Sequence, residues 1–460
     1  MIYCRQKAQK AQKGLKGLKG LNGFNLASYG LCRRDVSPPA SGEKHNSPHQ
    51  WVSLALVFVL LSALTTNSNA VEATNGATLP LILRDTPKPN YGVPHPQMIS
   101  GRITRMEEGN KAQGVEDISV TDGYSVVKTD AAGAYSLVPD PSAVFVYITR
   151  PSGYDVTGSW YKPLAAEVGF TLKAAAEDEN EYIFIHVTDT HLSGSPRSQK
   201  GLSDFVTELN SLTPKPRFVV NSGDLISLSK ALKSSVATGQ TDLRTYVGIM
   251  NNLDMPHYNV AGDHTDSAYR MEDFPRGDHR CDKPLYWEHL GPNFFSFEYG
   301  KIHFMAIDSS YHLGKRQING AEYPTLEIQP MHQAWMKQDM SMRKAGSFVV
   351  TASETDLVEQ CPGFMEMAAE NDVRFQLTGD IHVLSEKQRD VPYRTGGALA
   401  GCWWNPKCNQ LCPDLNPQGY LVYRVVGERM EHFYKGLGQR VAILSHRVGA
   451  PWQGQVEIQA

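Results

Sequence analysis

Four short polar motifs, each directly after an apolar run, restrict the folds open to this chain. In order they are Asp189-Thr190-His191, Gly223-Asp224, Gly262-Asp263-His264 and Gly379-Asp380-Ile381-His382. The preceding runs are rich in β-branched and aromatic residues, which favour buried strands. Because functional groups in α/β folds gather beyond the strand ends, we expect these aspartates and histidines to converge on one metal site. Carboxylate and imidazole suit hard or borderline divalent ions.

The spacing of apolar residues between the motifs predicts an α/β domain over residues 180–385. Tyr182 to Val187 has the composition of a buried strand, and Leu202 to Leu212 places apolar residues at helical spacing. Further strands are expected at 294–299, 302–307 and 373–377. Such alternation implies a layered arrangement of sheets and helices. The alternative for any single motif is an aspartate or histidine that only caps a helix or ties a loop.

The flanking regions have other patterns. Short strands with frequent turns predict a β-sandwich module at 97–175, after a linker at 71–96, and hairpin-like segments predict a small β-rich module at 386–460. A chain of 460 residues has room for two or three such domains. Its net charge of −3 carries no signature of nucleic-acid binding.

Residues 1–70 read as a basic leader followed by a signal peptide. Val52 to Leu64 is an apolar run of about 13 residues, too short for a membrane span of about 20. Ser68-Asn69-Ala70 has the small-x-small form of a cleavage site. We therefore expect an exported chain, periplasmic or extracellular, without a transmembrane span after cleavage. The alternative is an uncleaved anchor.

The ordered motifs resemble those of the calcineurin-like metallophosphoesterases. The resemblance is greatest to the exported bacterial type, with an N-terminal immunoglobulin-like module and a C-terminal β-rich module that Gly396 to Trp404 and Gly419-Tyr420 resemble. It implies a four-layer α/β/β/α sandwich for 180–385 and a phosphoester substrate.

By the same resemblance, the motif residues have separate roles. Asp189, His191 and His382 would be ligands of a first metal, and Asp224 would bridge it to a second. His264 would be the catalytic acid that protonates the leaving oxygen.

Three positions depart from the family pattern, and all three concern the second metal. Asp263 stands where the family has asparagine, and Asp380 stands where it has histidine. Ala352-Ser353-Glu354 occupies the place of a further histidine. Asp189, Asp224, Asp263 and Asp380 would cancel the charge of two divalent ions, where the usual site keeps a positive excess. The cofactors expected are one or two divalent ions, with Mg, Mn or Ca favoured over Zn or Fe in the second position.

Two functions follow from this sequence. The first is an exported metal-dependent phosphoester hydrolase that uses a metal-bound hydroxide and has an atypical carboxylate-rich second metal site. The reduced positive charge favours a diester over a dianionic monoester. The second is a catalytically inactive metal- or ligand-binding envelope protein on the same fold.

Overall fold

The structure is a computed structural model. The residues that it describes are 87–90, 93–107, 111–228, 235–265, 283–310, 312–318, 321–326, 328–401, 410–439, 442–443 and 458–459. The leader and signal peptide predicted at 1–70, and most of the linker predicted at 71–96, lie outside these residues. In the described part of the chain, no helix is both long and apolar enough to cross a membrane.

The short strands predicted near the N-terminus form two sheets. One has the order β2-β1-β9-β7, with β5 also paired to β1, and the other has the order β4-β3-β6-β8. Apolar side chains of both sheets, including Ile103, Val120, Ile148 and Leu172, pack into one core. The strands are β1 Ile99–Glu107, β2 Lys111–Gly114, β3 Ser119–Thr121, β4 Val126–Lys128, β5 Ala134–Leu137, β6 Phe145–Ile148, β7 Tyr154–Thr157, β8 Tyr161–Pro163 and β9 Phe170–Ala174.

The next strands form a sheet of order β12-β11-β10-β21-β22. β10, β11 and β12 are parallel, so the segments that follow them lie at one edge of the sheet. The strands are β10 Glu181–Val187, β11 Val219–Asn221, β12 His257–Asn259, β21 Gly419–Val426 and β22 Arg429–Gly436.

The C-terminal hairpin, which lies within the module predicted at 386–460, continues the sheet that contains β10. β21 is antiparallel to β10, and Glu181 pairs with Val426. The reason is packing: Tyr420 and Val422 belong to the same buried core as Ile185 on β10. The sequence pattern showed the hairpin but not the distant strand with which it pairs.

A second sheet has the order β13-β14-β17-β18-β20-β19. The strands expected at 294–299 and 302–307 are present as β13 and β14, and they pair antiparallel. The strands are β13 Phe294–Tyr299, β14 Ile302–Ile307, β17 Phe348–Ser353, β18 Val373–Thr378, β19 Ser385–Lys387 and β20 Tyr393–Thr395. Two further hairpins pair β15 His312–Ile318 with β16 Ala321–Leu326, and β23 Ala442–Ile443 with β24 Ile458–Gln459.

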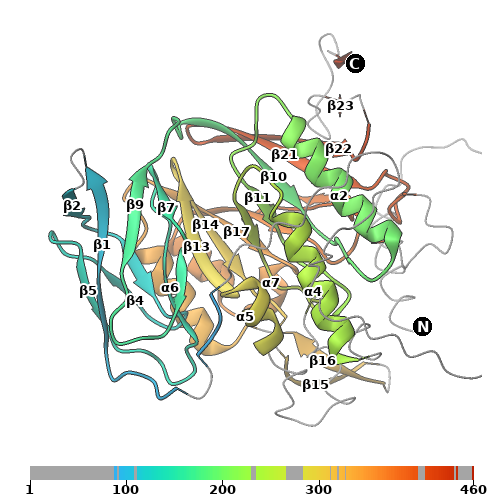
Figure 1. Cartoon of the computed structure of the whole chain (residues 1–460). Coiled ribbons are helices and arrows are strands. Elements are labelled where there is room, and N and C mark those ends of the chain that lie inside the picture. The colour runs from blue at the N-terminus through green and yellow to red at the C-terminus, as the bar shows by residue number, and fades with distance from the viewer. Residues whose placement is uncertain are drawn as a thin grey trace, which may run out of the picture. The chain divides into compact units, whose positions relative to one another are not determined.

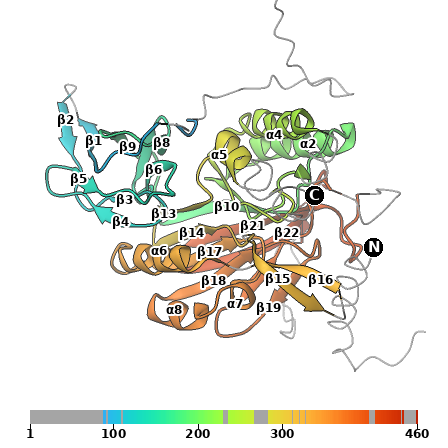
Figure 2. The same cartoon turned by 90° about the horizontal axis from the view of Figure 1, so that it is seen from below.

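Helices cover the two sheets, as Figures 1 and 2 show. Buried residues of α2 Pro196–Ser211, α4 Val236–Met250 and α5 Pro284–Leu290 share a core with β10 and β11. Those of α6 Pro330–Ser341, α7 Leu357–Gln360 and α8 Phe364–Glu370 share a core with β14 and β17. A third core, rich in aromatic residues, joins side chains of both sheets. The mixed α/β class is confirmed.

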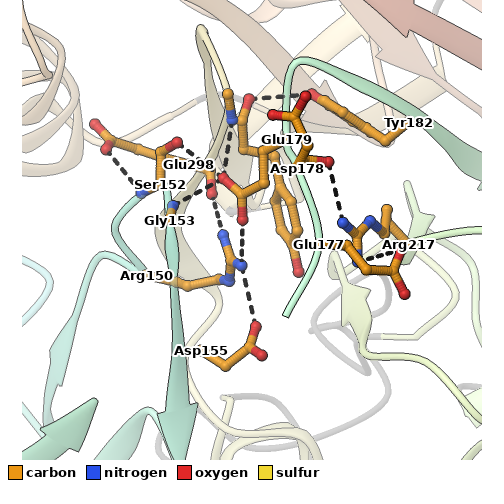
Figure 3. Close-up of polar contacts among 12 residues, drawn as sticks. Arg150, Ser152, Gly153, Asp155, Glu177, Asp178, Glu179, Tyr182, Arg217 and Glu298 are labelled. Carbon is orange, nitrogen blue, oxygen red and sulfur yellow. Dashed lines mark hydrogen bonds and ion pairs between the residues drawn. The ribbon is translucent and has the colours of Figure 1, made fainter. Parts of the chain in front are cut away.

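A buried ionic cluster links the N-terminal strands to the β13–β14 turn (Figure 3). The Arg150 guanidinium donates to Glu179 Oε1 at 2.6 Å and to the carbonyl oxygen of Glu298, and lies 3.6 Å from the centre of the Tyr299 ring. Glu179 Oε2 accepts from Gly153 N and from Gly300 N at 2.9 and 3.1 Å. Each buried charge is thus paired and hydrogen-bonded, as burial requires.

Candidate metal centre

The polar motifs of the sequence lie directly beyond the ends of strands. Asp189 and His191 follow β10, Asp224 follows β11, and Asp263 follows β12. The loops are tied together through the backbone, because Asp189 N donates to the Gly223 carbonyl at 3.1 Å and His191 N to the Asp224 carbonyl at 2.8 Å. The second sheet contributes Glu354 after β17, and Asp380 and His382 after β18.

The backbone at these positions has an uncommon conformation. Asp189, His191, Asp224, Asp380 and His382 all have positive φ, between 44° and 72°. Non-glycine residues rarely take these values, and the strain is a recurring property of functional sites. The surrounding hydrogen bonds hold a geometry that the isolated chain would not favour.

Glycines leave the space into which the polar side chains extend. A Cβ at Gly223 would lie 1.8 Å from Glu354 Oε2, and one at Gly379 would lie 2.0 Å from Thr188 Oγ1. A Cβ at Gly262 would lie 2.4 Å from Asp224 Oδ1. Any side chain at these positions would displace the carboxylates, so the glycines belong to the construction of the site.

One group of donor atoms contains two imidazoles and two carboxylates. Asp189, His191, Asp224 and His382 each bring a donor atom within 4.8 Å of the others. Nε2 of His382 lies 2.9 Å from Asp189 Oδ1 and 2.9 Å from His191 Nε2, and His191 Nε2 lies 3.3 Å from Asp224 Oδ2. Ligand atoms about 2.1 Å from a tetrahedral ion are separated by roughly 3.4 Å, which agrees with these contacts.

Two further groups share residues with the first. Asp224, Asp263 and His264 form one, and Asp263, Glu354 and Asp380 form the other, with donor atoms again within 4.8 Å. The structure thus brings all seven predicted site residues together. Their roles as ligands and acid stay predictions.

Glu354 is the member of the site that the sequence analysis did not select. The position was noted only as lacking the histidine that the family has there. The available signal was its place at the end of β17, the same place that the other acidic residues hold on their strands.

The site's electrostatics favour a bound cation. In the described residues, Oδ2 of Asp224 and both oxygens of Glu354 are buried and accept no hydrogen bond. Burial, followed by the charge of Asp263, raises the pKa of Asp224 well above its usual value. Burial, followed by the charge of Asp224, does the same to the pKa of Glu354. A divalent cation would supply the missing partner and reverse both shifts.

The histidines are suited to bind such an ion. Burial, the largest effect, lowers the pKa of His191, which favours the neutral ring that a metal requires. At Asp189 burial alone would raise the pKa, but His382 and His191 outweigh it and the pKa is lowered, so this carboxylate stays ionised. The residues present therefore fit a divalent metal.

One known family has a model that matches the N-terminal part of the chain. Residues 98–185 match the family model described as the N terminal of calcineurin-like phosphoesterase. A comparison with curated proteins gives no significant match. The matched segment comprises the N-terminal strands and most of β10, so this similarity is independent of the metal-site residues. The family that this model describes consists of metallophosphoesterases, which are hydrolases.

Solved structures that resemble the chain include metal-dependent phosphatases. A dimetal phosphatase from Danio rerio has 10% identity and a TM-score of 0.40, with 57% of this chain and 98% of that one covered. A purple acid phosphatase from yellow lupin seeds has 9% identity and a TM-score of 0.38, with 74% and 67% covered. The anchor protein of the Plasmodium inner membrane complex has 12% identity and a TM-score of 0.34, with 61% and 90% covered.

Proposed function

We propose that this protein is a metal-dependent phosphoester hydrolase with a carboxylate-rich second metal site. The observation that carries the proposal is one cluster of buried acidic and imidazole donors with a partly exposed histidine at its edge. Among the described residues, both carboxylate oxygens of Glu354 in this cluster accept no hydrogen bond. A purely structural cluster of this kind would leave several like charges uncompensated, at high cost.

The ligands follow from the donor groups. Asp189, His191, Asp224 and His382 would hold one divalent ion, and Asp224 would also contact a second ion held by Asp263 and Asp380. Divalent ions supply Lewis-acid polarisation of a phosphoryl oxygen and activation of water.

His264 is the proposed acid. Its backbone N–H donates to Asp224 Oδ1 at 2.8 Å, which fixes the residue at the edge of the cluster. Its side chain is 25% exposed, whereas that of His191 is 2% exposed. Nε2 lies 3.9 Å from Asp263 Oδ1, so the partly exposed ring lies beside the cluster, where a leaving oxygen could reach it.

The charge of the site selects the substrate class. Glu354 adds a fifth acidic group to Asp189, Asp224, Asp263 and Asp380. Five carboxylates exceed the charge of two divalent ions unless one retains a proton. A phosphodiester, with a single negative charge, is repelled less by such a site than a dianionic monoester.

The proposal also includes the arrangement of layers in the fold, the nature of the N-terminal module and the export of the protein from the cytoplasm. The sheets and helices of 180–385 are consistent with a four-layer α/β/β/α sandwich, and the N-terminal strands with an immunoglobulin-like module. The apolar run and the Ser68-Asn69-Ala70 site support export to the periplasm or beyond. N-terminal sequencing of exported protein should begin near Val71, and a mature chain that keeps residues 1–50 would refute export.

The test of the hydrolase proposal combines metal analysis with turnover. Protein purified without chelator is expected to contain divalent metal and to hydrolyse bis(p-nitrophenyl) phosphate faster than p-nitrophenyl phosphate, with Mn, Mg, Ca, Fe and Zn compared. Asp189→Ala should abolish turnover, while Asp204→Asn, on the surface of α2, should leave it unchanged. Metal binding without hydrolysis of either ester would reject the hydrolase in favour of the metal-binding envelope protein.

A further inference from the structure

Glu354 is placed in the fold as a buried ligand would be. It directly follows β17, its side chain is 0% exposed, and neither of its carboxylate oxygens accepts a hydrogen bond among the described residues. Its backbone carbonyl accepts from Gly379 N at 2.9 Å, which fixes the end of β17 beside the end of β18. A buried carboxylate without a protein partner is costly unless something outside the chain binds it.

The groups around the Glu354 carboxylate are acidic. Donor oxygens of Asp263 and Asp380 lie within 4.8 Å of it and of each other. Asp224 and Asp189 also act on it as like charges. Gly223 and Gly379 lack the Cβ atoms that would fill this space. The result is a group of oxygen donors, in contrast to the neighbouring group that contains His191 and His382.

We infer that Glu354, Asp263 and Asp380 form an all-oxygen site that selects a hard divalent cation. The inference rests on the proposed metal centre and adds a ligand and a selectivity to it. Carboxylate oxygens suit Ca²⁺, Mg²⁺ and Mn²⁺, whereas imidazole favours Zn²⁺ and other borderline ions. The centre therefore binds two different ions, one in the group with both histidines and one in the group with Glu354.

Competitive binding to the purified full chain tests this directly. After removal of metal, calorimetric titration and metal analysis should give one Zn²⁺ per chain, and one Ca²⁺ per chain in the presence of that Zn²⁺. Mg²⁺ and Mn²⁺ titrations determine which hard ion the all-oxygen site binds most tightly. No hydrolysis is measured, so the outcome is separate from that of the turnover test.

Paired variants locate each ion. Glu354→Gln should weaken Ca²⁺ binding at least tenfold and keep one Zn²⁺, which also shows that the variant is folded. His382→Ala should weaken Zn²⁺ binding and keep Ca²⁺. Glu366→Gln, an exposed glutamate in the first turn of α8, is the control and should change neither.

A double substitution should shift the metal preference of this site from Ca²⁺ to Zn²⁺. Asp263→Asn with Asp380→His should raise Zn²⁺ binding from one to two per chain and weaken Ca²⁺ binding. The inference is overturned if Glu354→Gln binds Ca²⁺ as the parent does, or if the parent binds two Zn²⁺ and no Ca²⁺. Calcium binding by a chain that hydrolyses no phosphoester would support the inference and reject the hydrolase.

Discussion

Neutralising Glu354 should stabilise the metal-free protein. Its carboxylate lies within 4.8 Å of acidic oxygens from Asp263 and Asp380. Two unit charges at that distance repel by about 3.5 kcal/mol at an effective dielectric constant of about 20. Because proton uptake already relieves part of this repulsion, we expect Glu354→Gln to raise the free energy of unfolding by roughly 1–3 kcal/mol, equivalent to roughly 1–4 °C in Tm for a chain of this size.

Calcium should stabilise the parent protein more than the variant, and so reduce or reverse the difference in their Tm values. At a hundredfold excess over its Kd, a ligand stabilises the folded state by about 2.7 kcal/mol, and Glu354→Gln should lose most of that gain. Thermal unfolding followed by circular dichroism, with chelator and then with Ca²⁺, measures both effects, with Glu366→Gln as control. If metal-free Glu354→Gln melts below the parent protein, the glutamate has a structural partner and the reasoning is wrong.

Three further perturbations test the site and the fold. Gly223→Ala should weaken Ca²⁺ binding in a titration, because its Cβ would meet Glu354 Oε2, whereas Gly346→Ala, also at positive φ but with open space around it, should only lower Tm. His264→Gln should slow hydrolysis of alkyl phosphodiesters far more than of p-nitrophenyl esters, whose leaving group needs no proton. Burial acts to lower the pKa of His303, but its carboxylate partners outweigh burial and raise it to about 9. The resulting stability, about 3 kcal/mol, is complete below about pH 6.5 and lost as pH rises through 9, so His303→Gln should be more destabilising in urea at pH 6 than at pH 9.5.

The sequence pointed to those residues of the cluster that follow a recognisable strand. Asp189, Asp224 and His382 each follow a strand that its own composition reveals, and parallel strands bring such ends together. Glu354 follows a strand in the same way, yet it was passed over because the expected residue type there was histidine. Residue type alone could not show that its carboxylate points at the other acids, since that depends on the glycines opposite it.

Long-range pairing was the part of the fold that the sequence could not indicate. The apolar run from Tyr420 to Val426 is typical of a strand, but it contains nothing that indicates β10 as its neighbour. A strand's apolar pattern records which of its faces is buried and leaves its partner undetermined. The partner of β21 is determined by the core that Tyr420 and Val422 share with Ile185 of β10.

The pairing of β21 with β10 also determines the stage of synthesis at which this sheet can be completed. Every candidate metal donor has left the ribosome once His382 has emerged, but Gly419 to Val426 are made later. Until then the strand that leads to Asp189 has an unpaired edge, which invites aggregation. A chain terminated before Gly419 would carry the full donor set on an open sheet. Such a fragment should be a target for proteases rather than a partial enzyme, so the metal centre is completed only after Val426 has been made.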